Sequence, residues 1–223
     1  MSGIDSEQLV RDLLPKVVEV ARRAGEAIMV VYQDLNPAVE WKLDKSPLTQ
    51  ADLASHRLIC EGLADISRYP VLSEESAEIP FKDRRSWEHF WLVDPLDGTK
   101  EFLKRNGEFT VNIALMKSGT PILGVVVAPA TDQTYFAGVG TGAHKSDKGV
   151  VSPIKVAGIQ NPTPRVAVSR WHGGGMDEMR VDLEKIGIDA DRCQFLAEEF
   201  RRLHLGRSAG ACSKAIDSDR RRS

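Results

Sequence analysis

Residues 91–102 of this 223-residue chain read Trp91-Leu92-Val93-Asp94-Pro95-Leu96-Asp97-Gly98-Thr99-Lys100-Glu101-Phe102. The dense apolar run before Asp94 predicts a buried strand over 90–93 that delivers this carboxylate to the strand end. Pro95 restricts its own φ and lacks an N–H donor, while Gly98 lets the backbone turn sharply and approach a ligand closely. We expect Thr99 to begin a short helical stretch whose free N–H groups and positive dipole end would receive a phosphate oxygen.

The two aspartates of this stretch, Asp94 and Asp97, can converge on one point. Hard oxygen ligands without His or Cys nearby suit Mg²⁺ or Mn²⁺ better than zinc, and the Leu96 carbonyl would add a third oxygen. An ordinary turn with a capping aspartate accounts equally well for the five residues Asp94-Pro-Leu-Asp-Gly98. The five-residue pattern by itself therefore leaves both interpretations open.

A second pair of acidic residues, Glu74 and Glu75, follows another apolar strand, which we expect over 70–73. If the two strands are neighbours, Glu74 meets Asp94 and Asp97 in a cluster of three carboxylates. Like charges a few ångströms apart take up protons unless cations neutralise them. The alternative is that Glu74 and Glu75 begin a solvated surface loop.

Asp52 lies at the start of a helix that we expect over 50–66, with Thr49 as its N-cap. Thr49-x-x-Asp52 satisfies a capping-box pattern, which alone would explain the aspartate. The other interpretation is that Asp52 orients a water molecule.

The rest of the chain predicts helices around a sheet. A 3.6-residue apolar stripe indicates a long amphipathic helix over 5–34, with Pro15 as a candidate kink, and another helix is expected near 176–186. Antiparallel strands are predicted over 109–115, 122–128 and 134–139, with a further strand over 165–169, and Gly138-x-Gly140-x-Gly142 indicates a hairpin turn. The class predicted is layered α/β or α+β.

Composition excludes several classes of protein. Lys plus Arg number 30 and Asp plus Glu 32, a net charge of −2, which argues against a protein that coats nucleic acid or anionic membrane. The longest apolar run, over 122–130, is about half the roughly 20 residues that a membrane-spanning helix needs. Residues 1–7 show no secretory signal, so a cytoplasmic location is expected, with peripheral inner-membrane contact left open. Neither the three cysteines nor the five histidines show zinc-site spacing.

The end of the sequence has a different character. Residues 200–223 carry seven basic side chains against two acidic ones, a charge of +5, and end in Arg-Arg-Arg-Ser. We expect one domain over 1–199 and an atypical basic tail over 200–223 that is solvated and poorly ordered. A basic arm for phosphate or nucleic acid is the alternative.

Three linked motifs carry a family resemblance: Ser46-Pro-x-Thr-x-Ala-Asp52, Ser73-Glu-Glu-Ser76 and the stretch from Asp94 to Phe102. In order and spacing, over roughly residues 5–170, they resemble the lithium-sensitive, Mg²⁺-dependent inositol-monophosphatase family. Thr-Lys-Glu-Phe after Gly98, and Ser169-Arg170, resemble its 3′(2′),5′-bisphosphate nucleotidase branch. The resemblance implies a layered αβαβα sandwich of the inositol-monophosphatase and fructose-1,6-bisphosphatase type.

The resemblance also implies roles for individual residues. Asp52 and Thr99 match the pair that positions and activates the attacking water, and the metal ligands match Glu74, Asp94, Asp97 and the Leu96 carbonyl. The implied substrate is a small nucleotide or sugar phosphate: adenosine 3′,5′-bisphosphate, with its sulfated relative as a second substrate. Substrate contacts are implied at Glu74, Leu96, Asp97, Gly98, Thr99 and Ser169. Mg²⁺ is the implied cofactor, with Mn²⁺ as a substitute and Li⁺ as an inhibitor; no nucleic-acid partner is expected, and a homodimer is left open.

One family motif has no counterpart in this chain. The remaining metal ligand of the family is the Asp of a Trp-Asp pair, whereas Trp41, Trp87, Trp91 and Trp171 all lack a following Asp. We therefore expect the C-terminal layer to be incomplete, as in a truncated or frameshifted sequence. The alternatives to a nucleotidase are an inositol or sugar phosphatase of the same chemistry, and an inactive family member that binds Mg²⁺ and phosphate.

Overall fold

The structure, a computed structural model, describes residues 5–34, 39–41, 47–76, 78–156, 165–167, 184–185 and 194–196. These residues fall in two compact units that divide between Lys155 and Val156. The expected boundary at residue 199 and the basic tail lie outside the described residues.

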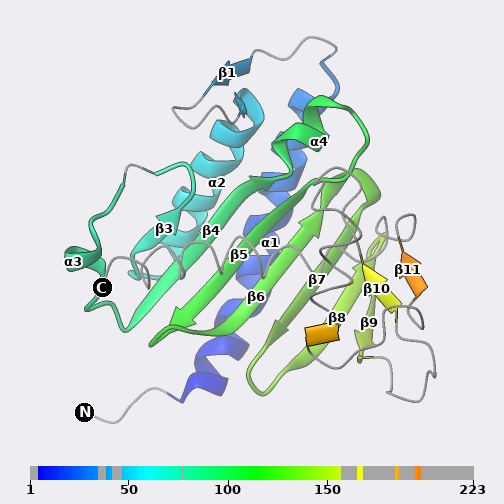
Figure 1. The fold of residues 1–223 in the computed structure, drawn as a ribbon. Helices are drawn as coiled ribbons and strands as arrows, with labels where there is room; N and C mark the ends of the chain where they lie inside the picture. Colours follow the sequence, from blue (N-terminus) through cyan, green and yellow to red (C-terminus); the bar gives the residue numbers. More distant parts are fainter. Residues whose placement is uncertain are drawn as a thin grey trace. The chain divides into compact units, whose positions relative to one another are not determined.

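The first unit is built on a mixed seven-stranded sheet with the order β3-β4-β5-β6-β7-β8-β9. Its strands are β3 (Val71–Ser73), β4 (His89–Asp97), β5 (Thr110–Lys117), β6 (Thr120–Ala128), β7 (Gln133–Gly138), β8 (Gly142–Asp147) and β9 (Val150–Ile154). β3 pairs with β4 in parallel, and every later neighbour is antiparallel. Figure 1 shows these strands side by side. The sheet confirms the predicted α/β class.

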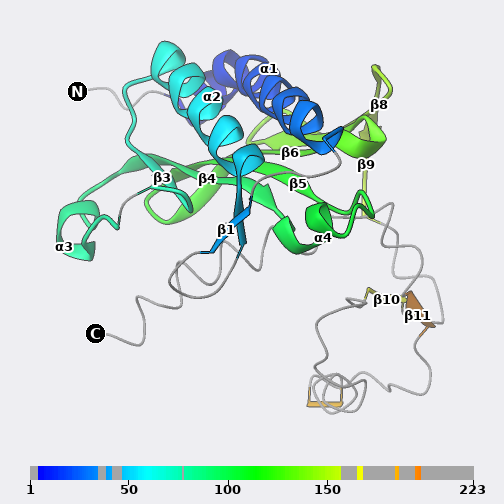
Figure 2. The ribbon, with the colours of Figure 1, turned by 90° about the horizontal axis from the view of Figure 1, so that it is seen from above.

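Two helices cover one face of this sheet, α1 (Ser6–Tyr32) and α2 (Gln50–Ile66). Figure 2 shows both on the same side of the strands. Their apolar stripes and alternate strand residues form a single core, in which Val17, Ile59, Trp91, Val111 and Leu115 are fully or almost fully buried. Burying such side chains stabilises the fold by about 1.5–3 kcal/mol each.

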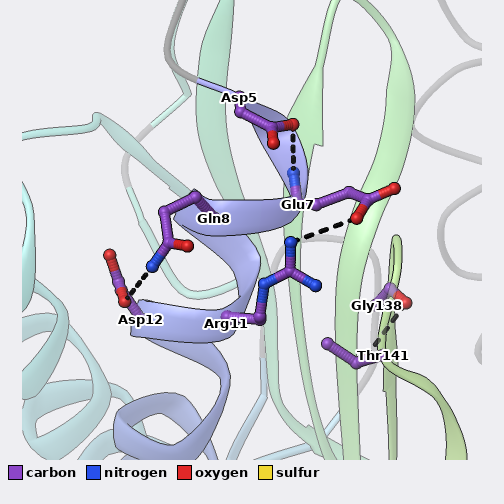
Figure 3. A network of polar contacts seen from close by, with 7 residues as sticks. All are labelled: Asp5, Glu7, Gln8, Arg11, Asp12, Gly138 and Thr141. Carbon is purple, nitrogen blue, oxygen red and sulfur yellow. Dashed lines mark hydrogen bonds and ion pairs between the residues drawn. The ribbon is translucent and has the colours of Figure 1, made fainter.

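Asp5 caps the N-terminus of α1. The Asp5 side chain accepts a hydrogen bond from the Glu7 N–H, which satisfies one of the free donors of the first turn. Glu7 then pairs with Arg11 one turn later, at 3.1 Å (Figure 3).

A Cβ added at Gly138 would clash with Val10, so the glycine allows α1 to pack closely over the end of β7. The predicted glycine-rich turn between β7 and β8 is confirmed.

Several boundaries differ from the prediction. β4 does not end at residue 93 but continues to Asp97, because its pairing with β5 resumes after an irregularity. β8 and β9 were not predicted, since the polar residues of β8 and the Pro of β9 weaken the strand pattern.

The smaller described elements complete the fold. They are β1 (Val39–Trp41), which pairs antiparallel with β2 (Pro47–Thr49), the short helices α3 (Phe81–Arg84) and α4 (Thr99–Leu103), and the 3-10 turn Pro129–Thr131. In the second unit, β10 (Arg165–Ala167) pairs in parallel with β11 (Gln194–Leu196). Of the helix expected near 176–186, residues 184–185 are described, and they are helical. The further layers of the expected sandwich, and its expected incompleteness, fall outside the described residues.

Candidate active site

Asp52 sits in the first turn of α2 and is almost completely buried. The predicted capping box forms: Asp52 Oδ2 accepts hydrogen bonds from the Thr49 N–H at 2.8 Å and from the Thr49 hydroxyl at 2.5 Å. Burial raises the pKa of the Asp52 carboxyl, although the Thr49 bonds oppose this shift. Capping uses one oxygen of this carboxylate and leaves Oδ1 available for a second partner.

That second partner is Thr99, 47 residues later in the chain. Its hydroxyl lies 3.3 Å from Asp52 Oδ1 and 3.3 Å from the Leu96 carbonyl, so one donor faces two acceptors. Thr99 is the first residue of α4, which confirms the predicted short helix. Gly98 precedes it with φ +95°, and a Cβ there would lie 2.8 Å from the Glu108 carbonyl oxygen. Glycine is therefore required where the chain turns from β4 into α4.

A β-bulge shapes the end of β4. Asp94 is in register with Asn112 and Asp97 with Thr110, so Pro95 and Leu96 together oppose one residue of β5. Regular alternation would place side chains three positions apart on opposite faces. The extra residue brings Asp94 and Asp97 to the same face of the sheet.

Ser55, one turn after Asp52 on α2, holds this bulge from the helix side. Its hydroxyl donates a buried hydrogen bond to the Pro95 carbonyl at 2.7 Å. Pro95 has no register partner on β5, and the bond gives its carbonyl a partner on α2.

Glu74 reaches Asp94 because β3 and β4 are neighbours. Ser73 is in register with Val93, and the Glu74 N–H donates to the Val93 carbonyl at 3.1 Å. Burial raises the pKa of Asp94 to about 9, with further contributions from the charges of Glu74 and Asp97 and from a hydrogen bond with Glu74. In the metal-free protein the Asp94 carboxyl therefore holds a proton at neutral pH, chiefly because burial disfavours its charged form.

The donor set fits a hard divalent cation. Asp94 Oδ1 and Asn112 Oδ1 are both buried without a hydrogen-bond partner, which is costly for an acceptor unless an ion or a water molecule satisfies it. Asn112 also donates to Asp97 Oδ2 at 3.4 Å. Among the described residues, no group of three His, Cys, Asp or Glu side chains is close enough together to hold a metal ion. Glu74 and Asp97 instead each interact with Asp94. A divalent cation would take the place of the proton on Asp94.

Most of the predicted site residues lie in this region. Thr99 contacts both Asp52 and the Leu96 carbonyl. The charges of Glu74 and Asp97 both raise the pKa of Asp94. Ser169 lies outside the described residues.

Within the described part of the chain, no helix is both long and apolar enough to cross a membrane.

Sequence reasoning missed three residues with polar contacts at or next to the site. Ser55 bonds the Pro95 carbonyl, His56 lies 2.9 Å from the Ser73 hydroxyl, and Asn112 donates to Asp97. Ser55 and His56 follow Asp52 at i+3 and i+4, a helical spacing that could have pointed to them. Asn112 is a polar residue inside an apolar strand, but its sequence context does not reveal its partner.

Comparisons with known proteins establish the family to which this chain belongs. The profile of the inositol monophosphatase family matches residues 10–172. The 3′(2′),5′-bisphosphate nucleotidases CysQ of Salmonella typhimurium and Escherichia coli K12 are each 47% identical over 178 and 177 residues, covering 78% of this chain and 70% of theirs. The crystal structure of CysQ from Bacteroides thetaiotaomicron superposes with a TM-score of 0.67 at 35% identity, covering 82% of this chain and 70% of that one. Its sequence and its fold together place this chain in the inositol monophosphatase family.

Proposed function

We propose that this chain is a Mg²⁺-dependent phosphomonoesterase that hydrolyses the 3′-phosphate of adenosine 3′,5′-bisphosphate to give AMP and inorganic phosphate. The same reaction on the 5′-phosphosulfate analogue would give adenosine phosphosulfate. The names of its bacterial relatives support the nucleotide substrate. The observation that carries the proposal is the interaction of Asp94 with both Glu74 and Asp97, beside the Asp52–Thr99 pair.

Glu74, Asp94, Asp97 and the Leu96 carbonyl would hold Mg²⁺. When bound, the metal supplies positive charge that neutralises phosphate oxygens and lowers the pKa of water. The protein residues contribute an all-oxygen donor set, which Mg²⁺ and Mn²⁺ prefer. The shared face created by the β4 bulge allows Asp94 and Asp97 to act on the same ion.

Asp52 and Thr99 would handle the proton of the attacking water. The Thr99 hydroxyl donates to Asp52, so it can accept a proton from water while passing its own to the carboxylate. The raised pKa of Asp52 makes this carboxylate a better base near neutral pH. The water oxygen forms the new bond to phosphorus and the bond to the 3′-oxygen breaks. That oxygen takes a proton from solvent, and Asp52 returns the proton that it accepted to solvent.

The backbone at Gly98 and Thr99 would receive the phosphoryl oxygens. Gly98 is the N-cap of α4 and Thr99 its first residue, and N–H groups at this end of a helix lack partners within the helix. Ser169 is proposed as a further substrate contact on the basis of the resemblance.

Phosphate release from adenosine 3′,5′-bisphosphate tests the proposal, measured with Mg²⁺, with EDTA and with Mg²⁺ plus Li⁺. We expect release with Mg²⁺, none with EDTA, and inhibition by Li⁺. Asp94→Asn should abolish the Mg²⁺-dependent release while circular dichroism shows a folded protein; unchanged turnover would reject the assignment. Faster release from an inositol phosphate would instead identify an inositol phosphatase.

A further inference from the structure

His56 connects α2 to the end of β3. It lies one helical turn after Asp52, and its Nδ1 is 2.9 Å from the Ser73 hydroxyl. Ser73 is buried, with 7% of its surface exposed, and it directly precedes Glu74. The sulfur of Cys60, one turn further along α2, lies 3.7–3.8 Å from the two ring nitrogens. The ring is therefore held between its own helix and the strand end.

The turn that carries Glu74 is held in two ways. Its backbone is tied to β4 by the bond from the Glu74 N–H to the Val93 carbonyl and closed by the bond from the Ser76 N–H to the Ser73 carbonyl, both 3.1 Å. Its side-chain anchor is Ser73, whose Oγ also accepts the Glu75 N–H at 3.4 Å. The contact with His56 links this anchor to α2, the helix that carries Asp52.

We propose that His56 is a positioning residue of the metal site, acting through Ser73 on the turn of Glu74. This inference rests on the metal site of the proposed function. Of the three carboxylates proposed as ligands, Glu74 comes from a turn and the other two from β4, so Glu74 depends most on what holds its backbone. Fixing that backbone before the ion arrives reduces the ordering cost of binding, as supporting residues around metal ligands do.

Three variants isolate the contact. His56→Leu removes both ring nitrogens, Ser73→Ala removes the hydroxyl that the ring contacts, and His56→Asn keeps a polar atom near the position of Nδ1. The matched control is Ser67→Ala, which removes another hydrogen bond between the α2 region and the sheet. Ser67 accepts from the Trp91 Nε1–H at 2.8 Å, at the opposite end of α2.

The measurement is Mn²⁺ binding to the full chain by electron paramagnetic resonance, without substrate, alongside the melting temperature in EDTA. We expect His56→Leu and Ser73→Ala each to weaken Mn²⁺ binding by about tenfold. The double variant should lose no more than the weaker-binding single variant, because both remove one contact. His56→Asn should recover most of the affinity, and Ser67→Ala should lower the melting temperature with Mn²⁺ affinity unchanged.

Wild-type affinity in both His56→Leu and Ser73→Ala, or an equal loss in Ser67→Ala, would overturn the proposal. If His56→Leu does not fold, Ser73→Ala decides, because it removes a single oxygen atom. A wild-type chain that binds no Mn²⁺ overturns the metal site and this inference together. A chain that binds Mn²⁺ in the expected pattern but releases no phosphate overturns only the proposed reaction.

Discussion

Asp94 and Asp97 lie on the same face of the sheet although three positions separate them in β4. The bulge at Pro95 and Leu96 adds one residue against β5 and so reverses the alternation between the two aspartates. A bulge that re-aims a side chain beside a site is a recurrent device, and here it concentrates negative charge around Asp94.

The stability of the metal-free protein should depend on pH through Asp94. The pKa of Asp94 is raised from 3.8 to about 9 in the folded protein, so between these values the folded chain holds a proton that the unfolded chain has released. The free energy of unfolding in EDTA should therefore fall as pH rises from about 4 to about 9 and level off above that. Urea denaturation at a series of pH values measures this slope. Asp94→Asn should flatten it, and an equal slope in the variant would show that another group is responsible.

Mg²⁺ should reduce the loss of stability that we expect as pH rises. Because the cation replaces the proton on Asp94, its binding should tighten as pH rises and should release protons. Isothermal titration calorimetry in buffers of different ionisation enthalpy counts these protons at pH 7. Binding without proton release would contradict the assignment of Asp94 as a ligand.

Thr99→Val should lower kcat far more than it lowers metal affinity. Valine has nearly the same shape but lacks the hydroxyl that donates to Asp52 and to the Leu96 carbonyl. Loss of a group that transfers a proton typically costs about 10²–10⁴-fold in rate. Steady-state phosphate release measures kcat, with Thr99→Ser as the control that keeps the hydroxyl. A serine variant as slow as the valine variant would assign Thr99 a packing role instead.

Ser55→Ala and Ser67→Ala should separate site geometry from stability. Each removes one hydrogen bond that links the α2 region to β4, at opposite ends of the helix. Each loss should cost about 0.5–1.5 kcal/mol of stability. Only Ser55→Ala, which frees the bulge beside the Leu96 carbonyl, should also weaken Mn²⁺ binding. Equal affinities in the two variants would indicate that the bulge holds its shape without Ser55.

Gly98→Ala should destabilise the fold more than Gly149→Ala. Both glycines have positive φ, +95° and +83°, so alanine at either is strained by about 1–2 kcal/mol. At Gly98 the new Cβ would also meet the Glu108 carbonyl, whereas nothing lies within 4 Å of a Cβ at Gly149. Urea denaturation should show roughly 1–3 kcal/mol of additional loss for Gly98→Ala. Similar losses would mean that the β4–α4 turn relaxes around the methyl group.

Much of the architecture could be predicted from local signals. The apolar stripes of α1 and α2, the Thr49–Asp52 capping box and the turn at Gly98 each depend on residues a few positions apart. β8 and β9 could not be predicted, because polar strand residues such as Lys145 are stabilised by neighbours that only the assembled sheet supplies, here the ring of Tyr135, which is in register with Lys145 on β7.

What the sequence alone determined, then, was the set of chemical groups and the elements that carry them: oxygen ligands at a strand end, a capped helix and a glycine turn. The tertiary structure decided which of these groups meet. The contacts of Glu74 with Asp94, of Asp52 with Thr99 and of His56 with Ser73 join positions 17 to 47 residues apart, and each depends on strand pairing or helix packing. Local periodicity carries no information on such pairings. A regular strand would have put Asp94 and Asp97 on opposite faces, and the bulge puts them on the same face.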